Sequence, residues 1–504
     1  MKKNVLPALL LIALALMPQV KAQQLSTSTA KVAFPVRLGI LADSQITTSQ
    51  GSHDYGMRRK AADRVARVAI RPAAVELLAP LMLERFLIKL EEQKVDVLLY
   101  LGDGANSGCK DELDTVFSLL DKSRQRSGIP SYYLIGNHDY LGTGNQTKMD
   151  IRQKLCNSSG TANPAETKKQ VIERISMHNL QSAKIDKNFA YSENTAVYPQ
   201  LKTCAGDDTG QFNIHHVGLL SNRGKQQPEV EILLVDTSDY RDVDFRPEIL
   251  SPDTSCEIFG GWGTKGSMSY KNLPEGSQIG TLAKLASPTA AYRLVASHYR
   301  PFDMNAVFPF NASISFVRDA LGDLLSKGEN IWVSGHTHAP SPIVDRFNVG
   351  KTLSNNKGSF DGINVGSTTD YNPHVIIVEA HGATGTRIGT SSLGYTKMGY
   401  AQDAVCSKVL HLARKEVALE GICGKRDYAV ALGLDQSYRK PCWDDKAAAT
   451  AGKNIEAFSA NASATLNIKP DEVKACLAYV ATTNEHPKKK GKAAAAPGSA
   501  IARP

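Results

Sequence analysis

The stretch SYYLIGNHD, residues 131–139, joins a run of apolar and aromatic residues to the polar segment GNHD. Runs rich in aliphatic, β-branched and aromatic residues are typical of buried strands. The sequence therefore predicts a strand followed closely by Asn137, His138 and Asp139. Gly, Asn and Asp are also common in turns, so GNHD taken alone fits an ordinary turn as well as a site.

Similar runs recur along the chain up to about residue 380, and most of them end directly on Asp, Asn or His. They are VRLGILAD (36–43), VDVLLYLGD (95–103), EILLVDTSD (231–239), YRLVASHY (292–299), NIWVSGHTH (330–338) and HVIIVEAHG (374–382). Between the first two, residues 71–94 carry apolar side chains at helical spacing. The order strand, helix, strand predicts a mixed α/β fold. Because ligands of open α/β folds bind at the carboxyl ends of strands, we expect the polar residues to meet at one edge.

The charge of the chain is concentrated at its two ends. The 504 residues are 42% hydrophobic and 22% charged, which is ordinary globular composition, and the formal net charge is +9. Most of this excess comes from Lys2, Lys3, Lys21, Lys488, Lys489, Lys490, Lys492 and Arg503. The near-neutral body argues against a dedicated nucleic-acid groove. The basic Ala/Pro/Lys tail predicts a disordered, solvated end, with contact to an anionic surface as the alternative.

The first 22 residues have the pattern of a secretory signal peptide. A basic start is followed by an apolar run of about a dozen residues and the small-residue pattern Val20-Lys21-Ala22. An uncleaved anchor is the alternative, but the run is shorter than the ~20 residues that a bilayer span needs. No later segment is apolar enough to cross a membrane. We expect a secreted or periplasmic protein that is not transmembrane.

The eight cysteines divide into two groups. Four lie in the first half (Cys109, Cys156, Cys204, Cys256) and four near the end (Cys406, Cys423, Cys442, Cys476). An exported chain meets an oxidising compartment, so disulfides are expected, and the grouping predicts two separately braced regions. The pairing cannot be deduced from the sequence. No CxxC pair is present, which argues against a zinc knuckle or a thioredoxin-like redox site.

The domain organisation follows the strand pattern. The strand-rich part, about residues 35–400, is expected to form one domain with polar insertions at about 141–230 and 241–277. The second insertion either lines a substrate entrance or faces solvent. Residues 401–486, with four cysteines, predict a small disulfide-braced helical C-terminal domain, and residues 487–504 form the basic tail.

Several polar strand ends are weak signals alone but form an ordered set. Besides GNHD, they are ADSQ (42–45), GDGAN (102–106), SHYRP (297–301) and GHTH (335–338). The series resembles the calcineurin-like metallophosphoesterases and covers roughly residues 35–380. The resemblance implies a four-layer αββα sandwich with a two-metal site. It leaves the helical C-terminal region unexplained.

Carried over position by position, the resemblance implies a set of metal ligands. Asp103 would bridge two metal ions, one of them also held by Asp43, His338 and the residue at position 45, the other by Asn137, His298 and His336. The family usually has His where this chain has Gln45. An amide oxygen is a weaker donor than imidazole toward zinc or iron. Gln45 would therefore bind directly, bind through water, or leave that metal more exchangeable.

The resemblance also implies catalytic roles for the metal ions and for several residues. Two divalent or trivalent ions of manganese, iron or zinc would generate a bridging hydroxide for in-line attack on phosphorus. His138 would donate a proton to the leaving oxygen or hold a phosphoryl oxygen, the alternative being an exposed turn histidine. Asn106 stands where related protein phosphatases have an Asp that orients this histidine, and Asp139 is a second candidate for that part. Asn106 also argues against the iron-tyrosinate site of purple acid phosphatases.

The function expected from these residues is that of an exported metal-dependent phosphoric ester hydrolase. Its substrates would be monoesters or diesters of small molecules such as nucleotides or sugar phosphates. A non-catalytic metal-binding or ligand-binding module on the same fold is the alternative, motivated by Gln45 and Asn106. A nuclease is a weaker alternative, which the near-neutral body disfavours.

Overall fold

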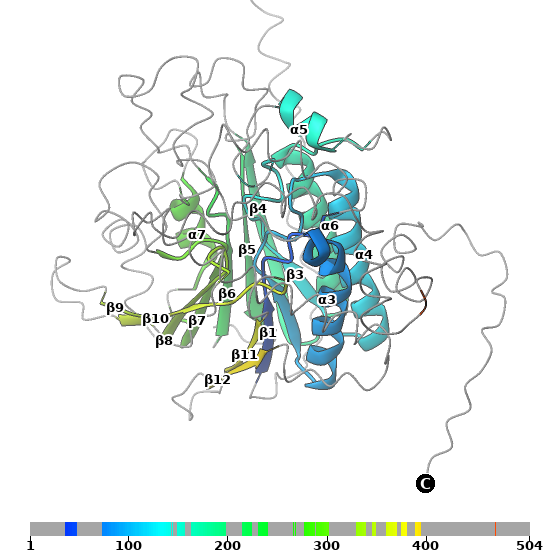
Figure 1. Cartoon of the computed structure of the whole chain (residues 1–504). Coiled ribbons are helices and arrows are strands. Elements are labelled where there is room, and N and C mark those ends of the chain that lie inside the picture. The colour runs from blue at the N-terminus through cyan, green and yellow to red at the C-terminus, as the bar shows by residue number, and fades with distance from the viewer. Residues whose placement is uncertain are drawn as a thin grey trace, which may run out of the picture.

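The structure is a computed structural model of the whole chain (Figure 1). The residues it describes are 36–47, 73–142, 144, 149–156, 163–197, 214–223, 230–239, 266, 268, 277–287, 289–301, 329–338, 345–348, 359–369, 374–380, 389–394 and 469. The predicted signal peptide, most of the predicted insertion at 241–277, the basic tail and all but one residue of the predicted C-terminal helical domain lie outside these ranges.

The described chain forms two β-sheets and five helices. The strands are β1 (Val36–Leu41), β2 (Val97–Tyr100), β3 (Ser131–Tyr133), β4 (Phe189–Val197), β5 (Ile214–Asn222), β6 (Val230–Val235), β7 (Tyr292–Ser297), β8 (Glu329–Ser334), β9 (Asp345–Asn348), β10 (Ser359–Asn364), β11 (His374–Ala380) and β12 (Gly389–Gly394). The helices are α3 (Ala73–Glu92), α4 (Lys110–Ser127), α5 (Met149–Cys156), α6 (Lys168–Ile185) and α7 (Gln278–Leu285). Each run that the sequence predicts as a strand is one, so the mixed α/β class is confirmed.

The strand order explains why the polar ends meet. One sheet has the order β12-β11-β1-β2-β3 and the other β4-β5-β6-β7-β8-β10-β9. β1, β2 and β3 run parallel in the first sheet, and β6, β7, β8 and β10 run parallel in the second. In parallel strands the carboxyl ends all point to one edge. The residues that follow these strands therefore gather there.

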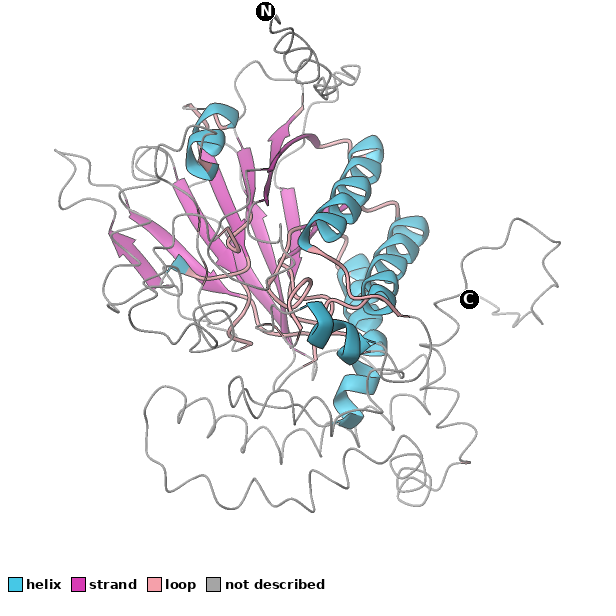
Figure 2. Ribbon diagram, turned by 90° about the horizontal axis from the view of Figure 1, so that it is seen from above, coloured by secondary structure: helices cyan, strands magenta, loops and turns pink. Residues whose placement is uncertain are grey.

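Side chains on the two faces of the first sheet enter different cores. Leu98 and Tyr100 pack in a cluster with residues of α3 and α4, whereas Val97 and Leu99 pack against strands of the second sheet. This alternation is the two-residue period of a strand buried on both faces. A third cluster joins β5, β6 and β7 to α7. Seen from above, most helices lie along one side of the strands and one short helix lies opposite (Figure 2).

The predicted insertion at about 141–230 has to be corrected for its described residues. It contains α5, α6, β4 and β5, and the last two extend the second sheet through β6. Polar residues of α6 satisfy the backbone of the edge strand β3, because Asn179 exchanges hydrogen bonds with Tyr133 at 2.8 and 3.0 Å. Unpaired backbone groups at a sheet edge need partners, so a polar sequence is what this helix face requires.

A disulfide joins Cys109, at the N-cap of α4, to Cys156 at the end of α5, with the Cα atoms 5.4 Å apart. The expectation of disulfide bracing in the first half of the chain is thus confirmed for one bridge. The other six cysteines lie outside the described residues. Within the part of the chain that the structure describes, no helix is both long and apolar enough to span a bilayer.

A buried ion pair fixes α6 to the end of β6. The Lys168 ammonium lies 2.7 Å from Asp236 Oδ2, both side chains are 0% exposed, and the ammonium also donates to the Ser238 carbonyl at 2.9 Å. Removing one partner of such a pair leaves an uncompensated buried charge, whereas replacing both with apolar residues is often tolerated.

We therefore predict that Lys168→Met lowers the free energy of unfolding by about 3–5 kcal/mol, measured by urea denaturation. The matched double variant Lys168→Met/Asp236→Leu should recover most of this loss. If Lys168→Met unfolds at the same urea concentration as the wild type, the ion pair does not stabilise the fold, which would contradict this role.

Candidate metal centre

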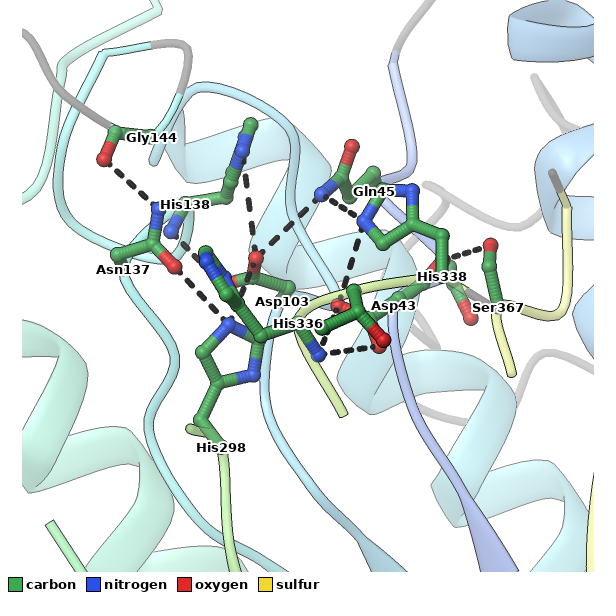
Figure 3. Close-up of polar contacts among 12 residues, drawn as sticks. Asp43, Gln45, Asp103, Asn137, His138, Gly144, His298, His336, His338 and Ser367 are labelled. Carbon is green, nitrogen blue, oxygen red and sulfur yellow. Dashed lines mark hydrogen bonds and ion pairs between the residues drawn. The ribbon is translucent and has the colours of Figure 1, made fainter. Parts of the chain in front are cut away.

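Backbone hydrogen bonds tie the loops that follow the parallel strands. In the first sheet the Asp43 amide donates to the Gly102 carbonyl at 3.1 Å, and in the second the Gly335 amide donates to the His298 carbonyl at 2.9 Å. Each loop thus continues the register of the strand before it. The candidate ligands from both sheets consequently face one another in a single cluster (Figure 3).

Asp103, the first polar residue after β2, lies at the centre of the cluster. Its carboxylate is fully buried; Oδ1 accepts from the His138 amide at 2.8 Å, and Oδ2 lies 3.1 Å from His298 Nε2. Burial raises the pKa of Asp103, but the charges of His298 and His138 more than offset this and hold the pKa well below its usual range. The carboxylate is therefore ionised and available to a cation.

His298 approaches Asp103 from the second sheet. Its Nδ1 donates to the Leu101 carbonyl at 2.9 Å, and its Nε2 faces Asp103 and the Asn137 side-chain oxygen, which is 2.9 Å away. Burial lowers the pKa of His298, but the Asp103 carboxylate raises it by more than burial lowers it. The net result is a pKa of about 9. The backbone carbonyl fixes the ring so that Nε2 points at the cluster, as in many metal-binding histidines.

The Asn137 amide has a defined orientation. Its Nδ2 donates to the Gly144 carbonyl at 2.7 Å, which turns the side-chain oxygen toward His298 (Figure 3). An amide has one donor end and one acceptor end, so satisfying the donor elsewhere leaves the acceptor for the centre. Asn137 is placed to offer an oxygen ligand.

Asp43, Gln45 and His338 form the other side of the cluster. His338 Nε2 lies 3.5 Å from Asp43 Oδ1 and 3.0 Å from Gln45 Nε2, and Gln45 Nε2 lies 3.4 Å from Asp103 Oδ2. Gln45 thus faces the cluster, as required of a residue that could contribute a ligand. Half a turn of the amide would exchange its nitrogen for its oxygen at this position.

The donor set fits a transition-metal cation. Asp103, His298 and His336 each offer one ligand atom, and these atoms lie within 4.8 Å of one another. Carboxylate, amide and imidazole donors without thiolate suit manganese, iron or zinc and differ from structural zinc sites, which are rich in cysteine. The sequence prediction of a metal site is supported at this level, while the number and identity of the ions stay predictions.

The backbone at the cluster is strained in a way that the sequence did not reveal. Among the described residues other than glycine, six have positive φ angles, and five of these are candidate ligands: Asp43 (55°), Gln45 (39°), Asp103 (55°), His336 (70°) and His338 (56°). Left-handed backbone is uncommon outside glycine and concentrates at functional sites, where the surrounding structure holds it. This concentration is independent support for a functional role of the cluster.

Two glycines of the motifs make room for carboxylates. A β-carbon at Gly335 would lie 2.6 Å from Asp43 Oδ2, and one at Gly136 would overlap Asp103 Oδ1. Real β-carbons do not approach so closely, so any other residue would displace the carboxylate. The glycines that open GHTH and GNHD are therefore part of the site rather than ordinary turn residues.

His138 is held by a backbone group, which corrects one expectation about Asn106. The His138 Nδ1 donates to the Asn106 carbonyl oxygen at 2.7 Å, while the Asn106 side chain donates to the Thr47 hydroxyl at 3.0 Å. The carbonyl, not the amide side chain, thus orients the ring. Since every residue type provides this carbonyl, the absence of an Asp at position 106 does not leave His138 without support.

Asp139 binds the backbone of the loops around Asp103 and does not orient the His138 ring, which corrects a second expectation. Its carboxylate accepts from the amides of Asp103, Ala105 and Gly136 at 2.9–3.1 Å and from the Tyr133 hydroxyl at 2.8 Å. Burial and the Asp103 charge raise the pKa of Asp139 to about 7. These bonds fix the backbone on which Asp103 stands.

Hydroxyl groups that sequence reasoning missed hold Asp43. The Ser367 hydroxyl donates to the Asp43 carbonyl at 2.6 Å, and the Thr369 hydroxyl donates to the Ser44 carbonyl at 3.0 Å. Both side chains are buried. The run STT at 367–369, directly after the apolar stretch INVG, was the signal that could have indicated them.

The comparisons with known proteins give remote likenesses only. No family model and no curated protein matches the chain. Among solved structures, the fold is similar to a dimetal phosphatase from Danio rerio (13% identity, 71% of this chain, 99% of that chain, TM-score 0.34). It is also similar to PhoD (11% identity, 74% of this chain, 71% of that chain, TM-score 0.34) and to GAP50, the anchor in the inner membrane complex of Plasmodium (11% identity, 71% and 89%, TM-score 0.26). At such scores they carry no evidence about chemistry.

The raised pKa of His298 predicts that metal binding releases a proton. With a pKa of about 9 the ring is charged at neutral pH, and Nε2 must lose its proton before it can bind a metal ion. Zinc titrations of metal-stripped protein near neutral pH, made by calorimetry in buffers of different ionisation enthalpy, should report release of at least about one proton per chain. Heats that do not change with the buffer would contradict this account.

Proposed function

We propose that the chain is a metal-dependent phosphoesterase built on an αββα sandwich and acting on small phosphate esters. The proposal is supported by one observation above all: six candidate ligands with the donor types of a two-ion site converge from both sheets at one edge. They are Asp43, Asp103, Asn137, His298, His336 and His338. Export, and substrates such as nucleotides or sugar phosphates, are part of the proposal.

The ligands divide between two positions. Asn137, His298 and His336 would hold one ion together with Asp103, whose carboxylate lies between the two groups. Asp43 and His338 would hold the second, with Gln45 beside them. Bound ions would polarise a phosphoryl oxygen and acidify a water molecule for attack on phosphorus.

His138 is the candidate for proton transfer. Its Nδ1 is committed to the Asn106 carbonyl, so Nε2 is the nitrogen that would face a substrate. Nε2 lies 4.0 Å from Asp103 Oδ2, so the ring edge that carries it faces the cluster. An imidazolium at this place can donate a hydrogen bond to a phosphoryl oxygen or a proton to the leaving oxygen.

The first test combines metal analysis with hydrolysis assays. Wild-type protein supplied with manganese, zinc or iron should hydrolyse a chromogenic phosphate monoester or diester. His138→Ala should bind the same number of ions and lose about 10²- to 10⁴-fold in kcat, because a proton donor is removed without touching a ligand.

His374→Ala is the matched control, since His374 begins β11 and belongs to no proposed ligand set. It should keep wild-type kcat. Wild-type protein that binds two ions and hydrolyses neither ester would favour the non-catalytic metal-binding module instead. Loss of metal from His138→Ala would show that this residue is a ligand rather than a proton donor.

Gln45 tests the assignment of the second ion. Replacing its amide with imidazole, a stronger donor toward zinc, should tighten binding of the second zinc ion, and Gln45→Leu should weaken it. Stepwise calorimetric titration with zinc separates the two events. Equal second-ion affinities for wild type, Gln45→His and Gln45→Leu would mean that this side chain contributes no ligand.

A further inference from the structure

Tyr299 brings an aromatic ring against two candidate ligands from different loops. The residue directly follows His298 and its side chain is fully buried. Its ring centroid lies 4.1 Å from that of His336 and 5.0 Å from that of His298, and the two imidazole centroids are 5.2 Å apart. Three rings thus form one packed cluster. Two of them, His298 and His336, belong with Asp103 to the set of residues whose ligand atoms could hold a metal ion.

The backbone of Tyr299 is fixed from neighbouring strands. Its amide donates to the Thr237 hydroxyl, just after β6, at 3.1 Å, and its carbonyl accepts from the Ser297 hydroxyl at 2.7 Å. The Ser297 oxygen in turn accepts from the Trp332 indole of β8 at 2.6 Å. The Ser297 hydroxyl therefore connects the strand that leads to His336 with the backbone of Tyr299 in the loop that carries His298.

The position of the Tyr299 ring requires a glycine at position 266. A β-carbon at Gly266 would lie 2.6 Å from Tyr299 Cγ and 2.7 Å from its Cβ and Cδ2. Real β-carbons essentially never approach so closely, so a side chain at Gly266 would force the ring to shift. The Tyr299 ring thus lies against the Gly266 backbone as well as against the two imidazoles, and Gly266 provides a way to move the ring without changing Tyr299.

We propose that Tyr299 is a positioning residue for the metal centre, whose ring holds His298 and His336 in their binding orientations. An imidazole side chain has two rotatable bonds, and packing against a fixed ring restricts both before any ion arrives. The entropy cost of ordering the ligands is then met during folding rather than during metal binding, which increases affinity. This inference rests on the metal centre of the proposed function.

The test is zinc affinity, measured by calorimetry on metal-stripped protein, for wild type, Tyr299→Leu, Tyr299→Phe and Gly266→Ala. Tyr299→Leu keeps an apolar side chain without a flat ring and should weaken zinc binding by about tenfold or more. Tyr299→Phe keeps the ring and should bind within about threefold of wild type, because ring packing is the source of the effect. Gly266→Ala should weaken binding in the same direction as Tyr299→Leu.

Stability and affinity are separated by urea denaturation of each metal-stripped variant. A purely structural role predicts reduced stability with unchanged zinc affinity in the folded protein, and that result in Tyr299→Leu would overturn the inference. So would equal weakening in Tyr299→Phe and Tyr299→Leu. If Tyr299→Leu does not fold, Gly266→Ala decides, and wild-type affinity there would overturn the inference. Wild-type protein that binds none of zinc, manganese and iron would instead overturn the proposed function.

Discussion

The buried charge of Asp103 is the constraint on which the rest of the site depends. A carboxylate with 0% exposure costs several kcal/mol unless positive charge and hydrogen-bond donors surround it. Here the His138 amide and the charged His298 ring provide that compensation. Because His298 comes from the second sheet, the charge of Asp103 links the two sheets at their common edge. A cation bound at the same place would replace the proton that His298 carries.

The backbone at this edge is held in conformations that would be unstable alone. Each left-handed residue other than glycine costs on the order of 1–3 kcal/mol. The surrounding bonds account for how this strain persists: Asp139 binds the backbone around Asp103, and the hydroxyls of Ser367 and Thr369 bind the backbone around Asp43. These groups act on the ligands indirectly, by fixing the loops that carry them. The favourable free energy of folding of the two sheets offsets the conformational cost of these left-handed residues.

The sequence predicted seven of the twelve described strands, because their aliphatic and aromatic runs report burial directly, and it missed β4, β5, β9, β10 and β12. It also predicted which strand ends carry polar residues, and the structure brings these residues together. It did not predict that α6, β4 and β5 belong to the core. The polar residues of α6 form hydrogen bonds with the backbone of the edge strand β3. That β3 lies at an edge, and so needs such partners, follows only from the strand order of the sheet. The Asn106 carbonyl was also missed, since backbone contacts leave no trace in residue types. Positive φ angles at Asp103 and His336 depend likewise on contacts between distant segments.

The central claim is that residues from both sheets hold a metal ion at this edge, and anomalous X-ray diffraction from crystals grown with zinc tests it most directly. The account predicts an anomalous peak at about 2.0–2.2 Å from a carboxylate oxygen of Asp103 and from imidazole nitrogens of His298 and His336. Data from crystals of zinc-saturated protein without a peak between these three residues, or with zinc only at other surface positions, would contradict it.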